Sequence, residues 1–102
     1  MSLKKQCQKK DQTCTVTFSL PKEATHSAKK VYLVGEFNDW ELYENPMKKL
    51  KDGSFSVTVK LASGREYQFR YFIDDTIWEN DWDADKYIHS SHGNCENSVV
   101  VV

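Results

Sequence analysis

The chain lacks long apolar runs and carries almost no net charge. No stretch of about 18 consecutive apolar residues occurs, so we expect no membrane-spanning segment and no membrane partner. The formal net charge is −1, and the sequence has no basic stripe of the kind that neutralises phosphates, so nucleic acid is not an expected partner. The basic cluster in residues 1–12 falls in a segment with few apolar residues. We expect a flexible N-terminal tail there, without a secretory signal.

Cysteine is also scarce, with three copies at Cys7, Cys14 and Cys95. An odd, sparse set is typical of free thiols in a reducing compartment, which predicts a cytoplasmic protein. A bridge between two of the three is an open alternative. Apart from the tail, the chain of 102 residues has room for one domain, which we place at residues 13–102. Its 39% apolar content is ordinary for a folded protein.

A helical repeat is missing as well, since no window of about 11 residues repeats its apolar positions every 3.6 residues. Apolar residues instead alternate with polar ones in short runs, which is typical of strands with one buried face. Residues 79–95 are acidic and irregular in pattern. Short strands at spacings of about 8–12 residues indicate an all-β antiparallel sandwich. The expected strands cover residues 13–20, 31–34, 47–50, 55–61, 67–73, 77–78 and 99–102.

The acidic segment offers weak metal motifs. Asp81, Asp83 and Asp85 have the opening spacing of a calcium loop, but the later Gly and Glu of that loop are missing. A solvated acidic loop is therefore expected. A zinc site would lack a fourth ligand and the usual paired spacing, so we expect exposed loop side chains at His89, His92 and Cys95. No metal ion or other cofactor is expected.

Signatures of catalysis are also missing. The sequence contains no Gly-x-Ser-x-Gly elbow, no phosphate-binding loop and no zinc-protease helix. Its carboxylates fall on expected loops or on outward strand faces, where burial would not raise a pKa for glycosidase chemistry. The chain is therefore predicted not to be an enzyme.

Three tryptophans each stand beside acidic or amide residues, at Trp40, Trp78 and Trp82. The alternating runs already supply a core, so we predict that Trp40 and Trp78 are exposed and form a binding platform. An indole face with polar neighbours suits a sugar, which has a C–H face and a hydroxyl edge. Such a site would be wet, with a Kd on the order of micromolar to millimolar. Trp82, between two aspartates, is expected to pack in the core or to plug a loop.

The run at residues 31–40 fits the pattern V-x-L-x-G-x-F-N-x-W. It resembles the signature of carbohydrate-binding module family 48, found in isoamylases, glycogen branching enzymes and the β subunit of AMP-activated protein kinase. Further segments resemble the family in the same order, at residues 52–55, 64–74, 80–81 and 97–101. The resemblance implies an immunoglobulin-like sandwich of the early-set kind. It also implies an α-1,4-glucan oligosaccharide or polymer, such as glycogen, as the partner.

Four site residues follow from the resemblance. Trp40 and Trp78 would hold consecutive glucose units, while Arg70 and Asn97 would bond their hydroxyl groups. The sequence departs from the family in three ways. Arg70 replaces a lysine, Ile77 is an extra residue that could shift the ring of Trp78, and residues 92–95 replace a segment that carries a leucine in the kinase-subunit members.

The resemblance leaves two rival functions open. In isoamylase-type members the module often packs on its own catalytic domain, so the same surface could dock a glucan-processing enzyme without binding free sugar. The chain could also be an accessory fragment that inherits a glycoside hydrolase label without hydrolase chemistry. We take α-glucan binding as the expected function.

Overall fold

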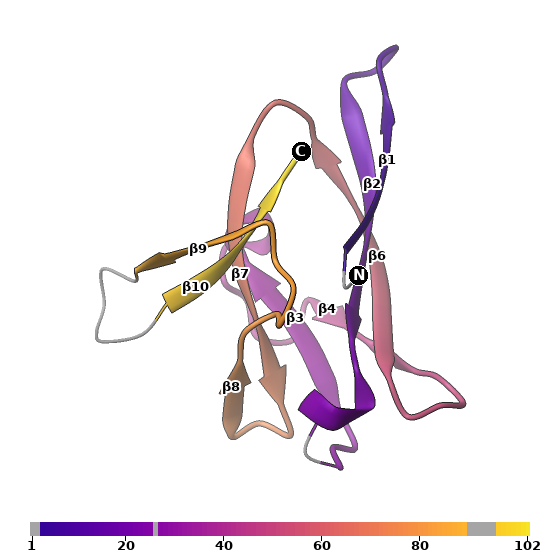
Figure 1. The fold of residues 1–102 in the computed structure, drawn as a ribbon, viewed down its shortest axis with the longest axis vertical. Coiled ribbons are helices and arrows are strands. Elements are labelled where there is room, and N and C mark those ends of the chain that lie inside the picture. Colours follow the sequence, from indigo (N-terminus) through magenta and orange to yellow (C-terminus); the bar gives the residue numbers. More distant parts are fainter. Residues whose placement is uncertain (1–2, 26, 90–95) are drawn as a thin grey trace.

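Two antiparallel β-sheets pack face to face and form a sandwich (Figure 1). The computed structural model of the chain describes residues 3–25, 27–89 and 96–102. Sheet A has the order β1 (Leu3–Gln8), β2 (Thr13–Leu20), β6 (Phe55–Ala62) and β5 (Lys48–Lys49). Sheet B has the order β4 (Asn45–Pro46), β3 (Val31–Gly35), β7 (Glu66–Ile73), β10 (Glu96–Val101) and β9 (Lys86–His89), with β8 (Ile77–Glu79) also paired to β7. The predicted all-β, immunoglobulin-like sandwich is confirmed.

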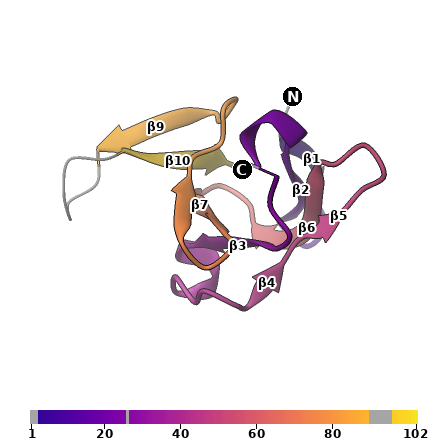
Figure 2. The same cartoon turned by 90° about the horizontal axis from the view of Figure 1, so that it is seen from below.

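Helical structure in the described residues is limited to two 3-10 turns, η1 (Lys22–Ala24) and η2 (Glu36–Asn38). None of the described helices is long and apolar enough to cross a membrane. In Figure 2, β1, β2, β5 and β6 of sheet A lie to the right of β7, β9 and β10 of sheet B, and the buried core lies between the sheets. Side chains that alternate along the strands fill this core, including those of Val16, Phe18, Leu20, Leu33, Phe55, Phe69, Tyr71 and Ile73.

The predicted N-terminal tail is wrong for Leu3–Gln8, which form β1. This strand pairs with β2 along its whole length, from Leu3 opposite Phe18 to Gln8 opposite Thr13. Only Leu3 of β1 is buried, so the alternation that reveals other strands is missing. Lysines on an edge strand also discourage pairing with a further chain.

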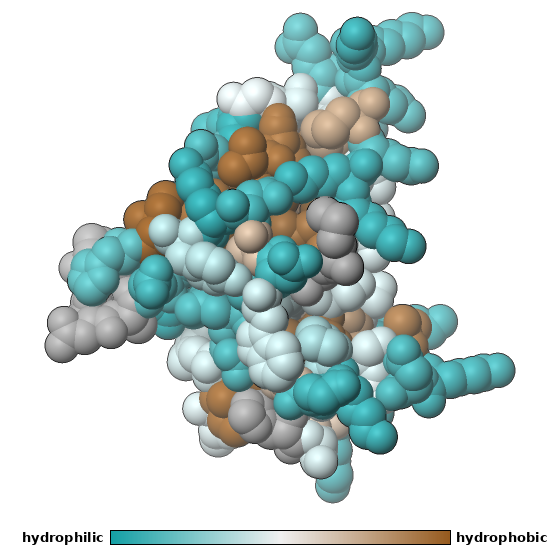
Figure 3. Space-filling view, in the orientation of Figure 1, coloured by the Kyte–Doolittle hydropathy of each residue, from teal (hydrophilic) through white to brown (hydrophobic). Residues whose placement is uncertain are grey.

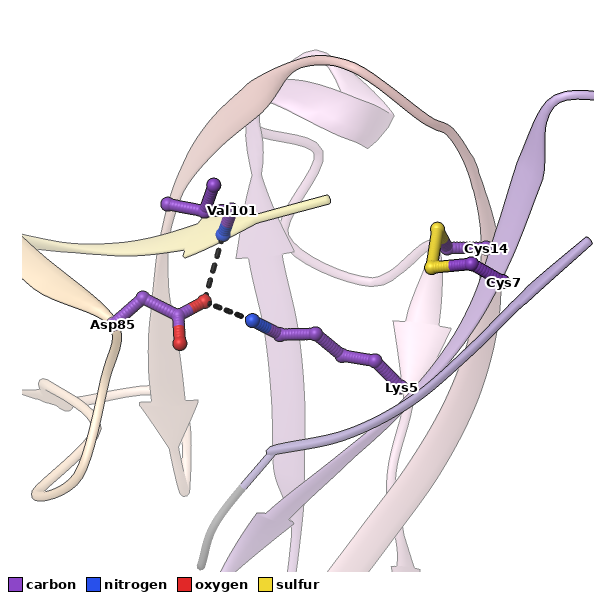
Figure 4. A network of polar contacts seen from close by, with 5 residues as sticks. All are labelled: Lys5, Cys7, Cys14, Asp85 and Val101. Carbon is purple, nitrogen blue, oxygen red and sulfur yellow. Dashed lines mark hydrogen bonds and ion pairs between the residues drawn. A yellow bond between two sulfur atoms is a disulfide. The ribbon is translucent and has the colours of Figure 1, made fainter. Parts of the chain in front are cut away.

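The expectation of free thiols is wrong for two of the three cysteines. Cys7 and Cys14 lie directly opposite each other on β1 and β2 and are joined by a disulfide (Figure 4). Cys95 lies outside the described residues. The cytoplasmic location expected from the cysteine count stays a prediction.

An ion pair connects β1 to the opposite sheet. Lys5 Nζ lies 2.6 Å from Asp85 Oδ2, and the same oxygen accepts a hydrogen bond of 2.7 Å from the backbone N–H of Val101 on β10 (Figure 4). Both charged side chains remain about 30% exposed. An exposed pair of this kind stabilises a fold by only about 0–1 kcal/mol. Its main effect is to join the edge of sheet A to β10.

The short edge strand predicted at residues 47–50 is confirmed as β5, at the edge of sheet A, but the chain crosses between the sheets just before it. β4 pairs with β3 in sheet B, whereas β5 pairs with β6 in sheet A. Met47, between them, is buried, and its N–H donates to the carbonyl oxygen of Val31 at 2.8 Å. The crossing therefore closes one side of the core.

The acidic segment is not irregular throughout, because Lys86–His89 form β9 beside β10. β10 begins at Glu96, three positions before the predicted strand. β9 and the start of β10 extend beyond the sandwich in both ribbon views (Figures 1 and 2). Hydrophilic side chains cover most of the surface seen in Figure 3, and a hydrophobic area appears near the C-terminal end of β10.

Candidate functional site

The outer face of sheet B is set by the alternation along its central strand, β7. Tyr67, Phe69, Tyr71 and Ile73 are buried toward the core. The intervening side chains of Gln68, Arg70 and Phe72 therefore lie on the opposite face. Strand pairing then identifies which side chains of β3, β8, β9 and β10 share that outer face with them, since directly opposed residues point the same way.

An aromatic row crosses this face. Phe72 lies opposite Tyr32 of β3 on one side and opposite Trp78 of β8 on the other. The rings of Phe72 and Trp78 pack against each other with their centroids 4.6 Å apart and their planes tilted by 34°. Tyr43, from the loop after β3, packs edge-on against Tyr32 at 5.0 Å and against Phe72 at 6.5 Å. We call Tyr32, Tyr43, Phe72 and Trp78 the aromatic row.

The members of the aromatic row differ in solvent exposure, with Phe72 buried beneath two exposed rings. Phe72 is almost fully buried, whereas Trp78 is 44% exposed. Tyr43 is exposed as well. Because Phe72 is buried, the indole of Trp78 packs on a fixed ring on one side and is exposed to solvent on the other. Packed aromatic pairs of this kind contribute about 0.5–1.5 kcal/mol beyond the area that they bury.

A polar row lies next to the aromatic row on the same face. Arg70 is two residues from Phe72 along β7, about 7 Å away. Arg70 Nε donates to Asn97 Oδ1 at 2.5 Å, and Asn97 Nδ2 donates to Gln68 Oε1 at 2.9 Å. These side chains, Gln68, Arg70 and Asn97, form the polar row. Asn97 is largely buried, so its clearest role is to hold Arg70 and Gln68 in place.

The turn between β7 and β8 positions Trp78. Asp74 and Asp75 both have positive φ, at 49° and 61°, which aspartate tolerates better than most residues. Asp74 Oδ1 accepts the backbone N–H groups of Lys29 and Lys30 at 3.0 and 2.9 Å, which ties the turn to the entrance of β3. The extra residue, Ile77, pairs with Ile73. Trp78 therefore still lies opposite Phe72, on the outer face.

Trp40 follows η2 at the far end of β3. Asn38 Oδ1 accepts the N–H of Gly35 at 3.1 Å, and Asn38 Nδ2 donates to Leu33 O at 3.0 Å and to Asn45 Oδ1 at 2.7 Å. The amide of Asn38 therefore fixes the loop. The backbone N–H of Trp40 donates to the carbonyl oxygen of Gly35 at 2.9 Å. Trp40 is 39% exposed.

Strand pairing places Trp78 relative to Gly35, the residue that anchors the loop of Trp40. Gly35, which anchors Trp40, lies opposite Phe69 of β7, while Trp78 lies opposite Phe72 on the other side of that strand. Three residues along β7 and two strand spacings then separate the backbones of Gly35 and Trp78 by roughly 14 Å. Arg70 lies between these points along β7. The structure thus places Trp78, Arg70 and Asn97 on one face, whereas Trp40 lies in the loop that follows β3.

The loop after β8 is held by a buried carboxylate. Tyr71 Oη donates to Asp81 Oδ2 at 2.6 Å, and Asp81 is only 1% exposed. Burial raises the pKa of Tyr71 well above its usual range, and the nearby charge of Asp81 raises it further. Ser98 Oγ accepts the N–H of Asp81 at 2.8 Å. The prediction of a solvated acidic loop is therefore wrong for Asp81, whose inward partner lies ten residues earlier in the sequence.

The other carboxylates of the calcium-like motif do not gather around Asp81. The N–H of Asp83 donates to Asp81 Oδ1 at 2.8 Å, whereas Asp85 bonds Lys5 and Val101. Within residues 3–25, 27–89 and 96–102, no three His, Cys, Asp or Glu side chains form a group that could hold a metal ion. His89 is exposed on β9. His92 and Cys95 lie outside the described residues, as does the segment 92–95 that departs from the family.

Trp82 does not pack in the core. Its side chain is 57% exposed, so the prediction of core or loop packing is wrong. Trp82 is followed by a short turn in which the backbone of Asp83 bonds Asp81. Sequence reasoning also missed Tyr43 and Gln68 as members of this face. Gln68 could have been found from its outward position on β7, but Tyr43 lies in a loop without any periodic signal.

Comparison with known proteins gives a family match over most of the chain. Residues 23–102 match the family described as the glycogen recognition site of AMP-activated protein kinase. No curated protein matches the chain. The matched range contains the aromatic row, the polar row and Trp40, but not β1 or β2. The resemblance found in the sequence is confirmed, and the chain belongs to this glycogen-recognition family of carbohydrate-binding domains.

Proposed function

We propose that the chain is a non-catalytic module that binds an α-1,4-glucan on the outer face of sheet B. Glucose units stack on the exposed indoles of Trp78 and Trp40. The polar row, through Arg70 and Gln68, bonds the sugar hydroxyl groups, and Asn97 orients both side chains. Binding tethers the domain to glycogen or to a similar polymer, together with any protein attached to it.

One observation carries the proposal, namely that the aromatic row and the polar row lie next to each other on the same face of sheet B. One side of the Trp78 indole packs on Phe72, with ring centroids 4.6 Å apart, and the rest of the ring is exposed. Arg70, one alternation away on the same face, is bonded to Asn97. A pyranose has the same division into an apolar face and a polar edge. The face is open to water, which fits a ligand whose hydroxyl groups exchange one set of hydrogen bonds for another.

Titration with maltoheptaose or β-cyclodextrin, followed by tryptophan fluorescence, tests the proposal. We expect a saturable signal with a Kd on the order of micromolar to millimolar. Trp78→Ala and Trp40→Ala should each weaken binding while the variants remain folded. Trp82→Ala is the matched control, because it removes an exposed indole outside the two rows and should leave the Kd unchanged.

Two results would contradict the proposal. If the unaltered chain gives no response at millimolar sugar, the face is better explained as a docking surface for a glucan-processing enzyme. If the purified chain releases reducing ends from glycogen, the module is catalytic. Equal losses in all three tryptophan variants would remove the special role of Trp40 and Trp78.

A further inference from the structure

We propose that Tyr43 forms an additional glucose-binding subsite beside Trp78, so that the glucan path continues across sheet B from β8 toward β3. This inference rests on the proposed function and adds a residue that determines the length of glucan that the face accommodates. Neither the sequence motif nor the four residues implied by it includes Tyr43.

The position of Tyr43 in the aromatic row is the first argument. Its ring is 57% exposed, more than that of Trp78. It stands edge-on to Phe72, and Phe72 in turn stacks against Trp78. Phe72 therefore lies beneath a continuous aromatic strip with an exposed ring at each end. The strip runs perpendicular to the strands, since Tyr32, Phe72 and Trp78 are cross-strand partners.

The second argument is that the Tyr43 ring is held at both ends. Its edge packs against Tyr32 with centroids 5.0 Å apart. Its hydroxyl group bonds the carboxylate of Asp75, which raises the pKa of Tyr43 above its usual value. Asp75 belongs to the turn that Asp74 ties to Lys29 and Lys30. A ring that is already fixed loses little conformational entropy when a ligand binds.

The chemistry around the ring favours a sugar. An exposed tyrosine face accepts the C–H groups of a pyranose, as an indole does. The carboxylate of Asp75 lies at the hydroxyl end of the ring, where it can accept hydrogen bonds from sugar hydroxyl groups. Asp75 belongs to the β7–β8 turn, so the Tyr43 ring connects this second polar group to the aromatic row. A glucan that stacks on Trp78 therefore meets another aromatic face and another acceptor when it extends toward β3.

Calorimetric titration with maltotriose and with maltoheptaose tests this subsite in the full chain. Tyr43→Ala should weaken the binding of maltoheptaose about two- to tenfold, the range expected for loss of one aromatic contact. The binding of maltotriose should change little, because a short chain occupies the tryptophans first. Tyr43→Phe keeps the ring and should retain most of the affinity. Leu50→Ala, an exposed apolar residue in the β5–β6 turn, is the control that should change neither ligand.

Three outcomes separate this inference from the proposed function. Unchanged maltoheptaose binding in Tyr43→Ala would overturn the subsite. Equal weakening of both sugars would also overturn it, because Tyr43 would then only support Phe72 and Trp78. If the unaltered chain binds neither sugar, the proposed function itself fails. Tyr43→Leu, which preserves apolar packing against Tyr32, should give the same length dependence and covers the case of an unstable alanine variant.

Discussion

Single residues in this protein depend on partners that are distant in sequence. Tyr71 lies on the buried face of β7, and its hydroxyl group reaches the carboxylate of Asp81. The alternation of β7 predicts that Tyr71 is buried and that Arg70 is exposed. It does not predict which polar group meets the buried hydroxyl, because that depends on the path of a loop. The same limit explains Trp82, whose acidic neighbours gave no information about its exposure.

Replacing Tyr71 by phenylalanine should destabilise the fold. The change removes the hydrogen bond to the buried Asp81, at an expected cost of about 1–3 kcal/mol in the free energy of unfolding. The pKa of Tyr71 in the folded state lies well above its ordinary value of 10.0. The unfolded chain therefore releases this proton first as pH rises, so the contribution of Tyr71 is present below about pH 10 and is lost above it.

Urea denaturation between neutral pH and about pH 11 measures both effects. The unaltered chain should lose stability above about pH 10 more steeply than Tyr71→Phe does. Because the other tyrosines titrate in both proteins, their contribution cancels in the comparison. Parallel pH profiles would show that the buried hydroxyl is not the group responsible.

At the scale of elements, β7 pairs along one edge with two different strands, one after the other. β8 pairs with Tyr71, Phe72 and Ile73, and β10 pairs with the residues from Glu66 to Phe69. Arg70 lies at the junction of the two pairings. Asn80 bridges them, because Asn80 Nδ2 donates to Glu96 O at 2.8 Å and Asn80 Oδ1 accepts the N–H of Ser98 at 3.0 Å.

Replacing Asn80 by alanine should loosen this junction. We expect a loss of about 1–3 kcal/mol in stability, since the N–H and hydroxyl groups of the buried Ser98 lose an acceptor. Hydrogen exchange at the Ser98 amide should become faster, while exchange in β2 and β6 should change little. Glucan binding should weaken as well, because β8 carries Trp78 and β10 carries Asn97. Unchanged protection at Ser98 would show that the strands hold together without the amide.

The strong strand patterns predicted most of the strands. The strands that the sequence did not predict were missed for the same physical reason. The alternation in β2, β6 and β7 indicates a half-buried strand, and each of these strands supplies the core. β1 buries only Leu3, and β9 has no fully buried residue among the side chains described. Both are edge strands held by backbone hydrogen bonds, and the alternation of apolar and polar residues does not reveal such bonds. The disulfide could not be predicted without the register of β1 against β2.

At the scale of the whole molecule, the family match covers sheet B but not all of sheet A. The match begins at residue 23, so β1 and β2 lie outside it. Yet β2 pairs with β6 over eight residues and contributes Val16, Phe18 and Leu20 to the core. The chain before the matched range is therefore part of the sandwich. β1 then closes its edge through the disulfide and through Lys5.

Reduction of the Cys7–Cys14 disulfide should lower the stability of the whole domain. A bond that closes a short loop is expected to contribute on the order of 2 kcal/mol, with wide variation between proteins. Thermal unfolding with and without a dithiol reductant measures the effect. Cys95→Ser should keep the response to reductant, whereas Cys7→Ser should be less stable and insensitive to it. If the reductant lowers the unfolding temperature of Cys7→Ser as much as that of the unaltered chain, a disulfide other than Cys7–Cys14 is responsible.

The disulfide and the proposed glucan-binding face belong to opposite layers of the sandwich. β1 and β2 hold the sulfur atoms, whereas Trp78, Arg70 and Asn97 are all carried by sheet B. Thermal resistance and ligand selectivity can therefore be altered independently, the first by editing the cysteine pair and the second by editing the outer rings. The stability of this domain as a polysaccharide tag could therefore be changed without altering the residues that we propose for glucan binding.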